Sequence, residues 1–310
     1  MRTGRLKTAL AAATALAALV VPGALPAASA SASTTVYTQG SIQHVIWILM
    51  ENRSETAIVG SPKAPYLNGL VARYGLATGY HNITHPSVPN YLGLTSGLPL
   101  ASLPVTDCTK CRQPGANIFT QGETWKSYEE SMTAPCAKTL SADKLYYPKH
   151  NPALYYSLIP TATCKADDVA YPALAVDLAN NTLPAFAFVA PNVMDDMHTG
   201  TIAQGDSWLA NNLPAILGSA AYQSGSTAVF ITWDEGTGAG KSNGMDCTNS
   251  PTSPSCNVAL LAVNPYTPPG TVATDFATHY SLLRLTEEVL GLPLLDQAAV
   301  APDLAPALGL

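Results

Sequence analysis

Short runs of apolar residues recur along the chain, and polar or glycine-rich segments separate them. Four runs, at residues 43–50, 185–190, 227–232 and 258–263, are apolar at most positions. Continuous apolar runs of this length predict strands that are buried on both faces of a sheet. Residues 76–80 predict one further, shorter strand.

Segments with helical spacing or helix-boundary residues lie between these runs. We predict helices at residues 65–74, 89–95, 125–131, 169–178, 206–217 and 279–290. Gly75 and Gly291 are expected at helix ends, and Asp206 at a helix start, where the helix dipole favours an acid. Strands that alternate with helices predict an α/β fold, a three-layer α/β/α sandwich around a mainly parallel sheet.

Residues 98–165 interrupt this alternation, because they are rich in Pro, Cys and Tyr and have no clear period. We predict an irregular, disulfide-containing insertion within a single domain that spans residues 33–310, a length typical of one α/β domain. Neighbouring cysteines suggest the pairs Cys108–Cys111, Cys136–Cys164 and Cys247–Cys256. A redox or zinc role for the first pair is the alternative, although no second CxxC motif completes a zinc site.

The first residues have the pattern of an export signal. Arg2, Arg5 and Lys7 precede a short apolar stretch at residues 9–21, and small residues follow it. This pattern predicts a secretory signal peptide at residues 1–32 and a secreted, extracellular protein. The apolar stretch is shorter than a membrane-spanning helix requires, so we expect no stable membrane anchor.

Composition narrows the classes of partner. Charged residues make up 12% of the chain and hydrophobic residues 47%, which is enough to fill a large core. The net charge of -6 leaves no basic patch for a nucleic acid or an anionic membrane surface. A small phosphorylated substrate remains compatible with this charge if a metal supplies the positive counterpart.

Polar residues stand where two of the predicted strands end. Glu51 and Asn52 follow the first strand, and Asp234 and Glu235 follow the strand at 227–232. Ser87 precedes a predicted helix, where an ordinary N-cap role is the alternative to a functional one. Ligands of α/β sheets bind beyond the carboxyl ends of the strands, so we expect these side chains to share one site.

A set of motifs carries a family resemblance. The segment Pro86-Ser87-x-Pro89-Asn90-Tyr91, followed by Thr95-Ser96-Gly97, is similar to the nucleophile motif of the alkaline-phosphatase superfamily. Further segments follow in order, namely Lys149-His150-Asn151-Pro152, Asp196-Met197-His198, Gly205-Asp206-x-Trp208-Leu209 and His279-Tyr280-Ser281. As a whole, the mature chain resembles the bacterial phosphoesterase family that contains secreted acid phosphatases and phospholipases C. The resemblance implies an alkaline-phosphatase-like fold.

The resemblance also implies roles for the residues at the strand ends. Glu51, Asn52, Asp234 and Glu235 would bind one or more divalent metal ions, and Ser87 would be the nucleophile. The acid phosphatases of the family carry two Asp at the later position, where this chain has Asp-Glu. Four oxygen ligands suit a hard cation such as Ca²⁺, Mg²⁺ or Mn²⁺.

Phosphoester cleavage also requires a proton donor and contacts to the phosphoryl oxygens. We expect His198 to serve as general acid or phosphate contact and His279 to contribute to catalysis. Asn90, His85 and His150 are candidate substrate-binding residues. The remaining histidines, His44 and His81, are expected to be structural.

These patterns favour a secreted metal-dependent phosphomonoesterase, an acid phosphatase that acts through a phosphoserine. A phospholipase C-type phosphodiesterase and a non-catalytic envelope-binding protein of the same fold are the alternatives, and a Ser-His-Asp esterase is a third. Residues 235–242 resemble a P-loop and residues 240–244 a hydrolase elbow, but no helical pattern follows either, so we predict a flexible loop near the metal. The sequence leaves the oligomeric state open.

Overall fold

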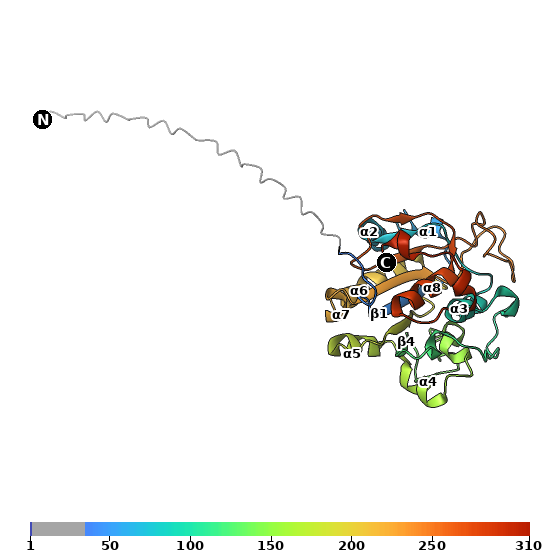
Figure 1. Cartoon of the computed structure of the whole chain (residues 1–310). Coiled ribbons are helices and arrows are strands. Elements are labelled where there is room, and N and C mark those ends of the chain that lie inside the picture. Colours follow the sequence, from blue (N-terminus) through green and yellow to red (C-terminus); the bar gives the residue numbers. More distant parts are fainter. Residues whose placement is uncertain (2–34) are drawn as a thin grey trace. The chain divides into compact units, whose positions relative to one another are not determined.

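The computed structural model describes Met1 and residues 35–310 (Figure 1). The predicted signal peptide therefore lies, apart from Met1, outside the described residues. Within residues 35–310, no helix is both long enough and apolar enough to cross a bilayer.

An eight-stranded sheet forms the centre of the molecule, in the order β5-β4-β6-β1-β7-β8-β2-β9. Its strands are β1 (His44–Met50), β2 (Gly75–Ala77), β4 (Trp125–Glu129), β5 (Asp168–Ala170), β6 (Phe186–Ala190), β7 (Thr227–Trp233), β8 (Leu260–Val263) and β9 (Val272–Ala273). The five strands from β5 to β7 are parallel, whereas β8 runs antiparallel to both of its neighbours. A second, two-stranded parallel sheet pairs β3 (Tyr80–His81) with β10 (Ala277–Thr278).

Helices flank this sheet, which confirms the predicted α/β/α architecture. They are α1 (Glu55–Ile58), α2 (Pro65–Arg73), α3 (Ser87–Ser96), α4 (Thr161–Asp167), α5 (Pro172–Asn180), α6 (Ile202–Leu217), α7 (Ala220–Gln223), α8 (His279–Leu290) and α9 (Ala305–Leu308). Residues 35–310 also contain the 3₁₀ turns η1 (Leu100–Ser102), η2 (Ile118–Thr120), η3 (Pro148–His150), η4 (Pro152–Tyr155) and η5 (Asp296–Val300). Helix α3 packs against α8, and α6 packs against α2 and α5.

The central strands are buried at nearly every position, as the apolar runs predicted. Every residue of β6 and β7 is buried, and Trp47 of β1 is fully buried. The Trp47 indole N–H donates a hydrogen bond of 3.0 Å to Thr286 of α8. A buried indole needs such a partner, so this bond fixes how α8 lies on the sheet.

The helix predicted at residues 125–131 is wrong, because residues 125–129 form strand β4. This strand lies between β5 and β6 and pairs with β6 from Trp125↔Phe186 to Glu129↔Ala190. Strand preference depends on the neighbours that a segment packs against, which sequence does not display. The segment 98–165 therefore contributes a strand to the central sheet as well as irregular structure.

Other boundaries also differ from the prediction. Residues 168–170 form strand β5, so the helix predicted at 169–178 begins only at Pro172, as α5. The strand expected at 76–80 is divided between β2 and β3, and a side chain at Gly79 would meet the Asp275 carbonyl oxygen at 2.4 Å. Gly75 begins β2 instead of closing α2, and a Cβ there would meet Thr267 at 2.6 Å. At both positions another segment comes so close that a side chain would clash, which explains why glycine is found there.

Helix α6 begins at Ile202, several residues before the predicted start. Thr201 caps it, accepting a 3.2 Å bond from Gln204 N–H, while the Gln204 side chain accepts a 2.8 Å bond from Thr201 N–H. Asp206 instead caps another helix, because its carboxylate accepts bonds from Tyr66 N–H at 3.1 Å and Leu67 N–H at 2.8 Å. It therefore joins α2 to α6.

Candidate active site

The carboxyl ends of β1 and β7 bring two acids together. Met50 pairs with Trp233 as the last residues of the two strands, so Glu51 and Asp234 follow side by side. The Asn52 N–H donates a hydrogen bond of 2.9 Å to Asp234 Oδ1. Asn52 has a positive φ of 54°, a conformation that Asn tolerates better than most residues.

Ser87 is the first residue of α3 and is buried beside these acids. Its hydroxyl lies 3.3 Å from Glu51 Oε2 and donates a hydrogen bond to it. The turn before it is fixed by Asn90, whose Oδ1 accepts bonds from two backbone N–H groups and whose Nδ2 donates to two carbonyl oxygens. The side chain of Asn90 therefore fixes the turn before Ser87, and both its oxygen and its nitrogen form hydrogen bonds within that turn.

Glu51 is the most highly connected carboxylate of the site. Tyr91, one turn after Ser87 on α3, donates a 2.6 Å hydrogen bond to Glu51 Oε1. Asn52 Nδ2 donates a 2.5 Å bond to Oε2, and His150 Nε2 lies 3.1 Å from Oε1. The spacing from Ser87 to Tyr91 places both on one helix face, a signal that the sequence contained.

The site brings several carboxyl groups together in a buried environment. Burial, with Asp234 and Asp196 adding to it, raises the pKa of Glu51 well above its usual range. Burial, followed by the charge of Glu235, raises the pKa of Asp234 to about 8. Within residues 35–310, Asp234 Oδ2 and Asp196 Oδ2 are buried atoms without a hydrogen-bond partner. Uncompensated carboxylate oxygens in this arrangement fit a divalent cation.

Glu235 contacts other residues than Glu51 does. Its Oε2 lies 2.5 Å from His85 Nδ1, and its Oε1 accepts a 2.6 Å bond from Lys241 Nζ. The Lys241 ammonium also donates to Asn52 Oδ1 at 3.2 Å. Lys241 belongs to the segment that resembles a P-loop, and it places positive charge beside the acids.

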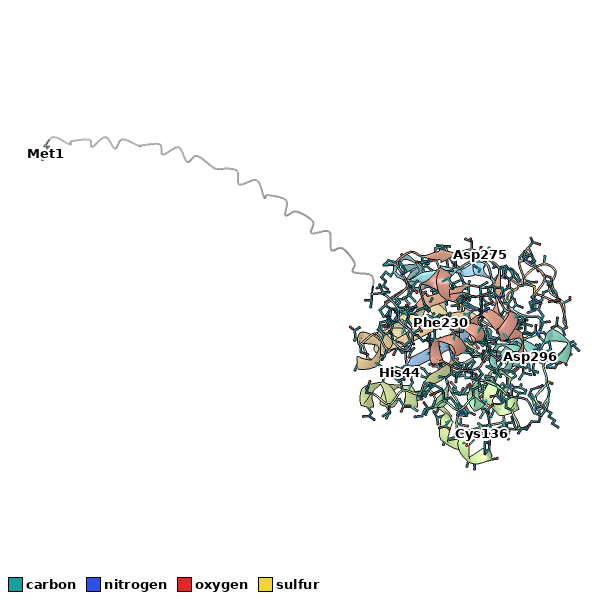
Figure 2. The ribbon with its side chains drawn as sticks, viewed as in Figure 1. Met1, His44, Cys136, Phe230, Asp275 and Asp296 are labelled. Carbon is teal, nitrogen blue, oxygen red and sulfur yellow. A yellow bond between two sulfur atoms is a disulfide. The ribbon has the colours of Figure 1, made fainter. Side chains whose placement is uncertain are left out.

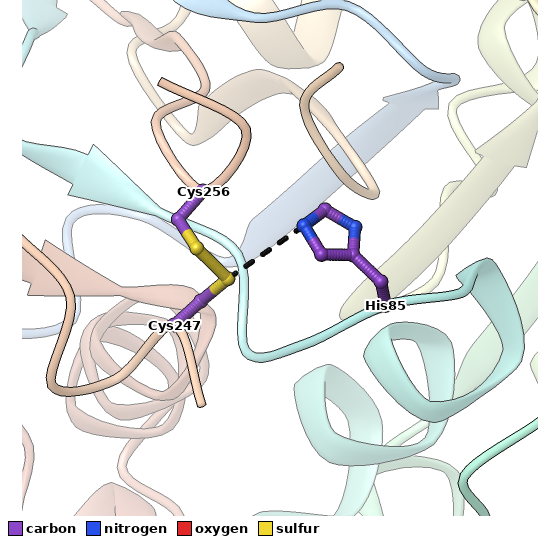
Figure 3. A group of neighbouring side chains, drawn as sticks. All are labelled: His85, Cys247 and Cys256. Atoms are coloured by element: carbon purple, nitrogen blue, oxygen red, sulfur yellow. Dashed lines mark hydrogen bonds between the residues drawn. A yellow bond between two sulfur atoms is a disulfide. The ribbon is translucent and has the colours of Figure 1, made fainter. Parts of the chain in front are cut away.

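His85 also lies against a disulfide (Figure 3). Its Nε2 is 3.8 Å from the sulfur of Cys247, which is bonded to Cys256. Because both sulfurs are used in the disulfide, this group of three side chains does not form a metal site. The predicted disulfides are confirmed, namely Cys108–Cys111, Cys136–Cys164 and Cys247–Cys256.

His150 and His198 lie together at the other side of Glu51. The His150 ring stacks on Tyr91 with centroids 5.6 Å apart, and its Nδ1 is 3.5 Å from Asp196 Oδ2. Burial lowers the pKa of His150 to about 3, so its imidazole is neutral. The His198 ring is 5.5 Å from that of His150, and both histidines offer ring nitrogens close enough to Glu51 to share an ion with it.

His279 lies behind the site, buried at the start of α8. Its Nε2 is 2.7 Å from the backbone carbonyl oxygen of Asp234, and its Nδ1 is 2.9 Å from the Tyr80 hydroxyl. Both ring nitrogens are therefore engaged. These contacts hold the ring against the end of β7, and the expected contribution of His279 to catalysis stays a prediction.

Comparison with known protein families identifies the family of this chain. The model of the Phosphoesterase family matches residues 60–293. The chain therefore belongs to the phosphoesterase family, and it is a hydrolase of phosphoester bonds. The family resemblance seen in the sequence is confirmed.

Curated relatives support the same assignment. The chain is 31% identical over 286 residues to a "Phosphatidylinositol-3-phosphatase" of Mycobacterium tuberculosis, covering 91% of this chain and 87% of that protein. It is 27% identical to an "Acid phosphatase" of Aspergillus fumigatus, over 72% of this chain. The alignment spans 49% of that fungal protein.

Solved structures show the fold. The phosphonate monoester hydrolase of Agrobacterium radiobacter superposes with a TM-score of 0.56 at 15% identity, covering 86% of this chain and 77% of that one. Murine ectonucleotide pyrophosphatase/phosphodiesterase 5 gives a TM-score of 0.54 at 11% identity, covering 82% and 96%. A member of the alkaline phosphatase superfamily from Vibrio parahaemolyticus gives 0.53 at 13% identity, covering 86% and 72%. The alkaline-phosphatase-like fold is thus confirmed.

Proposed function

We propose that this chain is a secreted, metal-dependent phosphatase that hydrolyses phosphate monoesters through phosphorylation of Ser87. The observation that carries the proposal is the buried Ser87 hydroxyl, 3.3 Å from Glu51 at the start of a helix. The names of the relatives, a phosphatidylinositol-3-phosphatase and an acid phosphatase, support a monoester substrate. Three disulfides support an oxidising compartment, in line with a mature domain of residues 33–310.

Glu51, Asn52 and Asp234 would hold the metal, with Glu235 beside them. Oxygen ligands of this kind favour a hard cation such as Ca²⁺, Mg²⁺ or Mn²⁺. When bound, such an ion would stabilise charge on the phosphoryl oxygens and lower the pKa of the serine hydroxyl. The buried Asp234 Oδ2, which has no partner within the described residues, supports this assignment.

The chain's own residues would then carry the two chemical steps. Ser87 Oγ loses its proton to solvent and attacks phosphorus, the P–O bond to the ester oxygen breaks, that oxygen takes up a proton and leaves as the alcohol, and phospho-Ser87 forms. His198, partly exposed beside His150, is the candidate donor of that proton. Water then attacks the phosphoserine, which releases orthophosphate and restores the hydroxyl. The N-terminus of α3 favours the negative charge in both steps.

A phosphoinositide monoester is a second candidate substrate. The 31%-identical relative bears the name of a phosphatase for such a lipid headgroup. A phospholipase C-type diesterase and a non-catalytic binding protein of the same fold remain as outcomes that the experiment below separates.

The test compares purified wild type, Ser87→Ala and the control Ser207→Ala, an exposed serine on α6. Substrates are p-nitrophenyl phosphate, its bis form, p-nitrophenyl phosphocholine and phosphatidylinositol 3-phosphate, each with and without a chelator. We expect monoester cleavage that the chelator abolishes and that Ser87→Ala lowers at least about a thousandfold. Acid-quenched enzyme should also carry phosphate on the Ser87 peptide.

Two results would replace the proposal. Turnover of the phosphocholine ester alone would support the phospholipase alternative. A wild type that is inert on every substrate across pH and added divalent cations would favour the binding protein. Ser207→Ala should retain wild-type activity, which shows that a serine substitution as such is harmless.

A further inference from the structure

The carboxylate of Asp107 lies against the first turn of α3, next to Ser87. Its Oδ1 accepts a hydrogen bond of 3.0 Å from the Val88 N–H. Its Oδ2 accepts a hydrogen bond of 2.8 Å from Lys149 Nζ. One carboxylate thus occupies two donors that come from separate elements, α3 and η3.

These two donors are the kind that bind phosphoryl oxygens. The first N–H groups of a helix attract anions, and a lysine ammonium binds phosphate as a point charge. Burial alone would lower the pKa of Lys149, but the charges of Glu51 and Asp107 outweigh burial and raise it. The ammonium therefore experiences the charge of Glu51 as well as that of Asp107 and stays charged.

Two further buried polar groups lie near Asp107. The Tyr155 hydroxyl makes no hydrogen bond within the described residues, and His150 Nε2 lies 3.1 Å from Glu51 Oε1. Both rings lie close enough to Asp107 to feel its charge. The surroundings of this carboxylate thus hold more polar groups than one carboxylate satisfies.

We propose that Asp107 occupies the position of substrate phosphoryl oxygens, and that a phosphate ester displaces it to reach Ser87. Asp107 precedes the Cys108–Cys111 disulfide, on a loop outside the central sheet. The inference rests on the proposed function, because it takes Ser87 as the nucleophile.

Displacement favours one class of ester. A monoester phosphoryl group carries roughly −1.5 to −2 charges near neutral pH, whereas a diester carries a single charge. The more strongly charged group competes better with a carboxylate for Val88 N–H and Lys149. Asp107 is therefore a specificity-determining residue that favours monoesters.

The alternative is that Asp107 only holds Lys149 in place for the substrate. The two roles predict opposite effects of removing the charge. If the Asp107 carboxylate competes with phosphate, its removal tightens phosphate binding, because the carboxylate no longer occupies the site for part of the time. A positioning residue, once removed, leaves phosphate bound more weakly.

The experiment is calorimetric titration of the full-length mature protein with orthophosphate, which requires no turnover. The variants are Asp107→Asn, Asp107→Ala, Lys149→Gln and the double variant Asp107→Asn/Lys149→Gln. Asp275→Asn, an exposed aspartate before β10, is the matched control; its place is labelled in Figure 2. We expect both Asp107 variants to bind orthophosphate about fivefold tighter than wild type.

Lys149→Gln should bind more weakly, and the gain from Asp107→Asn should shrink in that background. In the same variants, the ratio of kcat/KM for p-nitrophenyl phosphate over its bis form should fall when Asp107 is neutralised. Equal or weaker phosphate binding by both Asp107 variants overturns the inference, as does Lys149→Gln with wild-type affinity. If wild type hydrolyses no ester but the Asp107 variants bind phosphate tighter, the proposed function fails while displacement stands.

Discussion

Glu51 shows how one buried carboxylate organises the residues around it. Ser87 and Tyr91 both donate to it from α3, and they use different oxygens. The end of β1 determines the position of the Glu51 carboxylate, while α3 determines the positions of the Ser87 and Tyr91 hydroxyls. The proposed nucleophile, Ser87, is therefore positioned through an acid that would also bind the metal.

At this scale, Tyr91→Phe tests the contact between α3 and Glu51. The ring that stacks on His150 is kept, but the 2.6 Å bond to Glu51 is lost. We expect the free energy of unfolding to fall by about 2 kcal/mol, because a buried carboxylate loses a donor. Misplacement of Glu51 should lower kcat about tenfold.

Urea denaturation and steady-state kinetics with p-nitrophenyl phosphate measure the two effects. Tyr171→Phe, which loses a 3.0 Å bond to Asn212 away from the acids, is the control and should keep wild-type kcat. Wild-type kcat in Tyr91→Phe would show that Glu51 does not depend on this bond.

Elements are held together by polar side chains placed at their ends. Asp206, in the second turn of α6, accepts hydrogen bonds from two N–H groups at the start of α2. Helix α2 begins after Ala64, which has no side chain capable of capping. The two helices therefore depend on one carboxylate from outside α2.

Asp206→Ala should weaken this connection. We expect a loss of about 1–2 kcal/mol in the free energy of unfolding, since the orphaned N–H groups lose their acceptor. The measurement is the urea midpoint, with Ser207→Ala, the next residue on α6, as the control. A midpoint equal to that of wild type would mean that water caps α2 equally well.

Stability of the whole molecule depends on buried acids that lie outside the active site. Burial, with Asp168 adding to it, raises the pKa of Glu129 well above its usual range, and burial raises the pKa of Asp168 to about 7. The Ser127 hydroxyl donates a hydrogen bond of 2.7 Å to Glu129 Oε1, and Asn151 Nδ2 donates one of 2.8 Å to Asp168 Oδ1. The two buried carboxyl groups thus lie on the neighbouring strands β4 and β5, and each accepts a hydrogen bond from a polar side chain.

Because both pKa values are higher in the folded state, the folded state holds more protons than the unfolded state. The contribution to stability is then present at low pH, below the unfolded pKa of about 4, and is lost as the pH rises through 7. Asp168→Asn should therefore lose less stability than wild type between pH 5 and pH 8.

Urea denaturation at pH 5 and pH 8, with chelator present throughout, measures this difference. Asp303→Asn, an exposed aspartate, is the control. The same loss of stability in wild type and Asp168→Asn would show that this pair does not titrate in the range.

The sequence by itself determined the parts of this protein that rest on local pattern. Apolar runs predicted β1, β6 and β7, and polar residues after two of them predicted the acids. Parallel strands end at one edge of a sheet, so neighbours in the pattern become neighbours in space. Ser87 followed from its place at a helix start and from the family motif.

Only the tertiary structure decided which residues from irregular segments reach the site. Asp107 and Lys241 lie in loops without period, and chain spacing does not encode contacts across the sheet edge. Residues 125–129 also form a strand only in the tertiary structure, because their pairing with β5 and β6 outweighs local preference. The structure also shows that polar atoms of Asn90 and His279 bond to the surrounding backbone, which depends on packing that the sequence does not display.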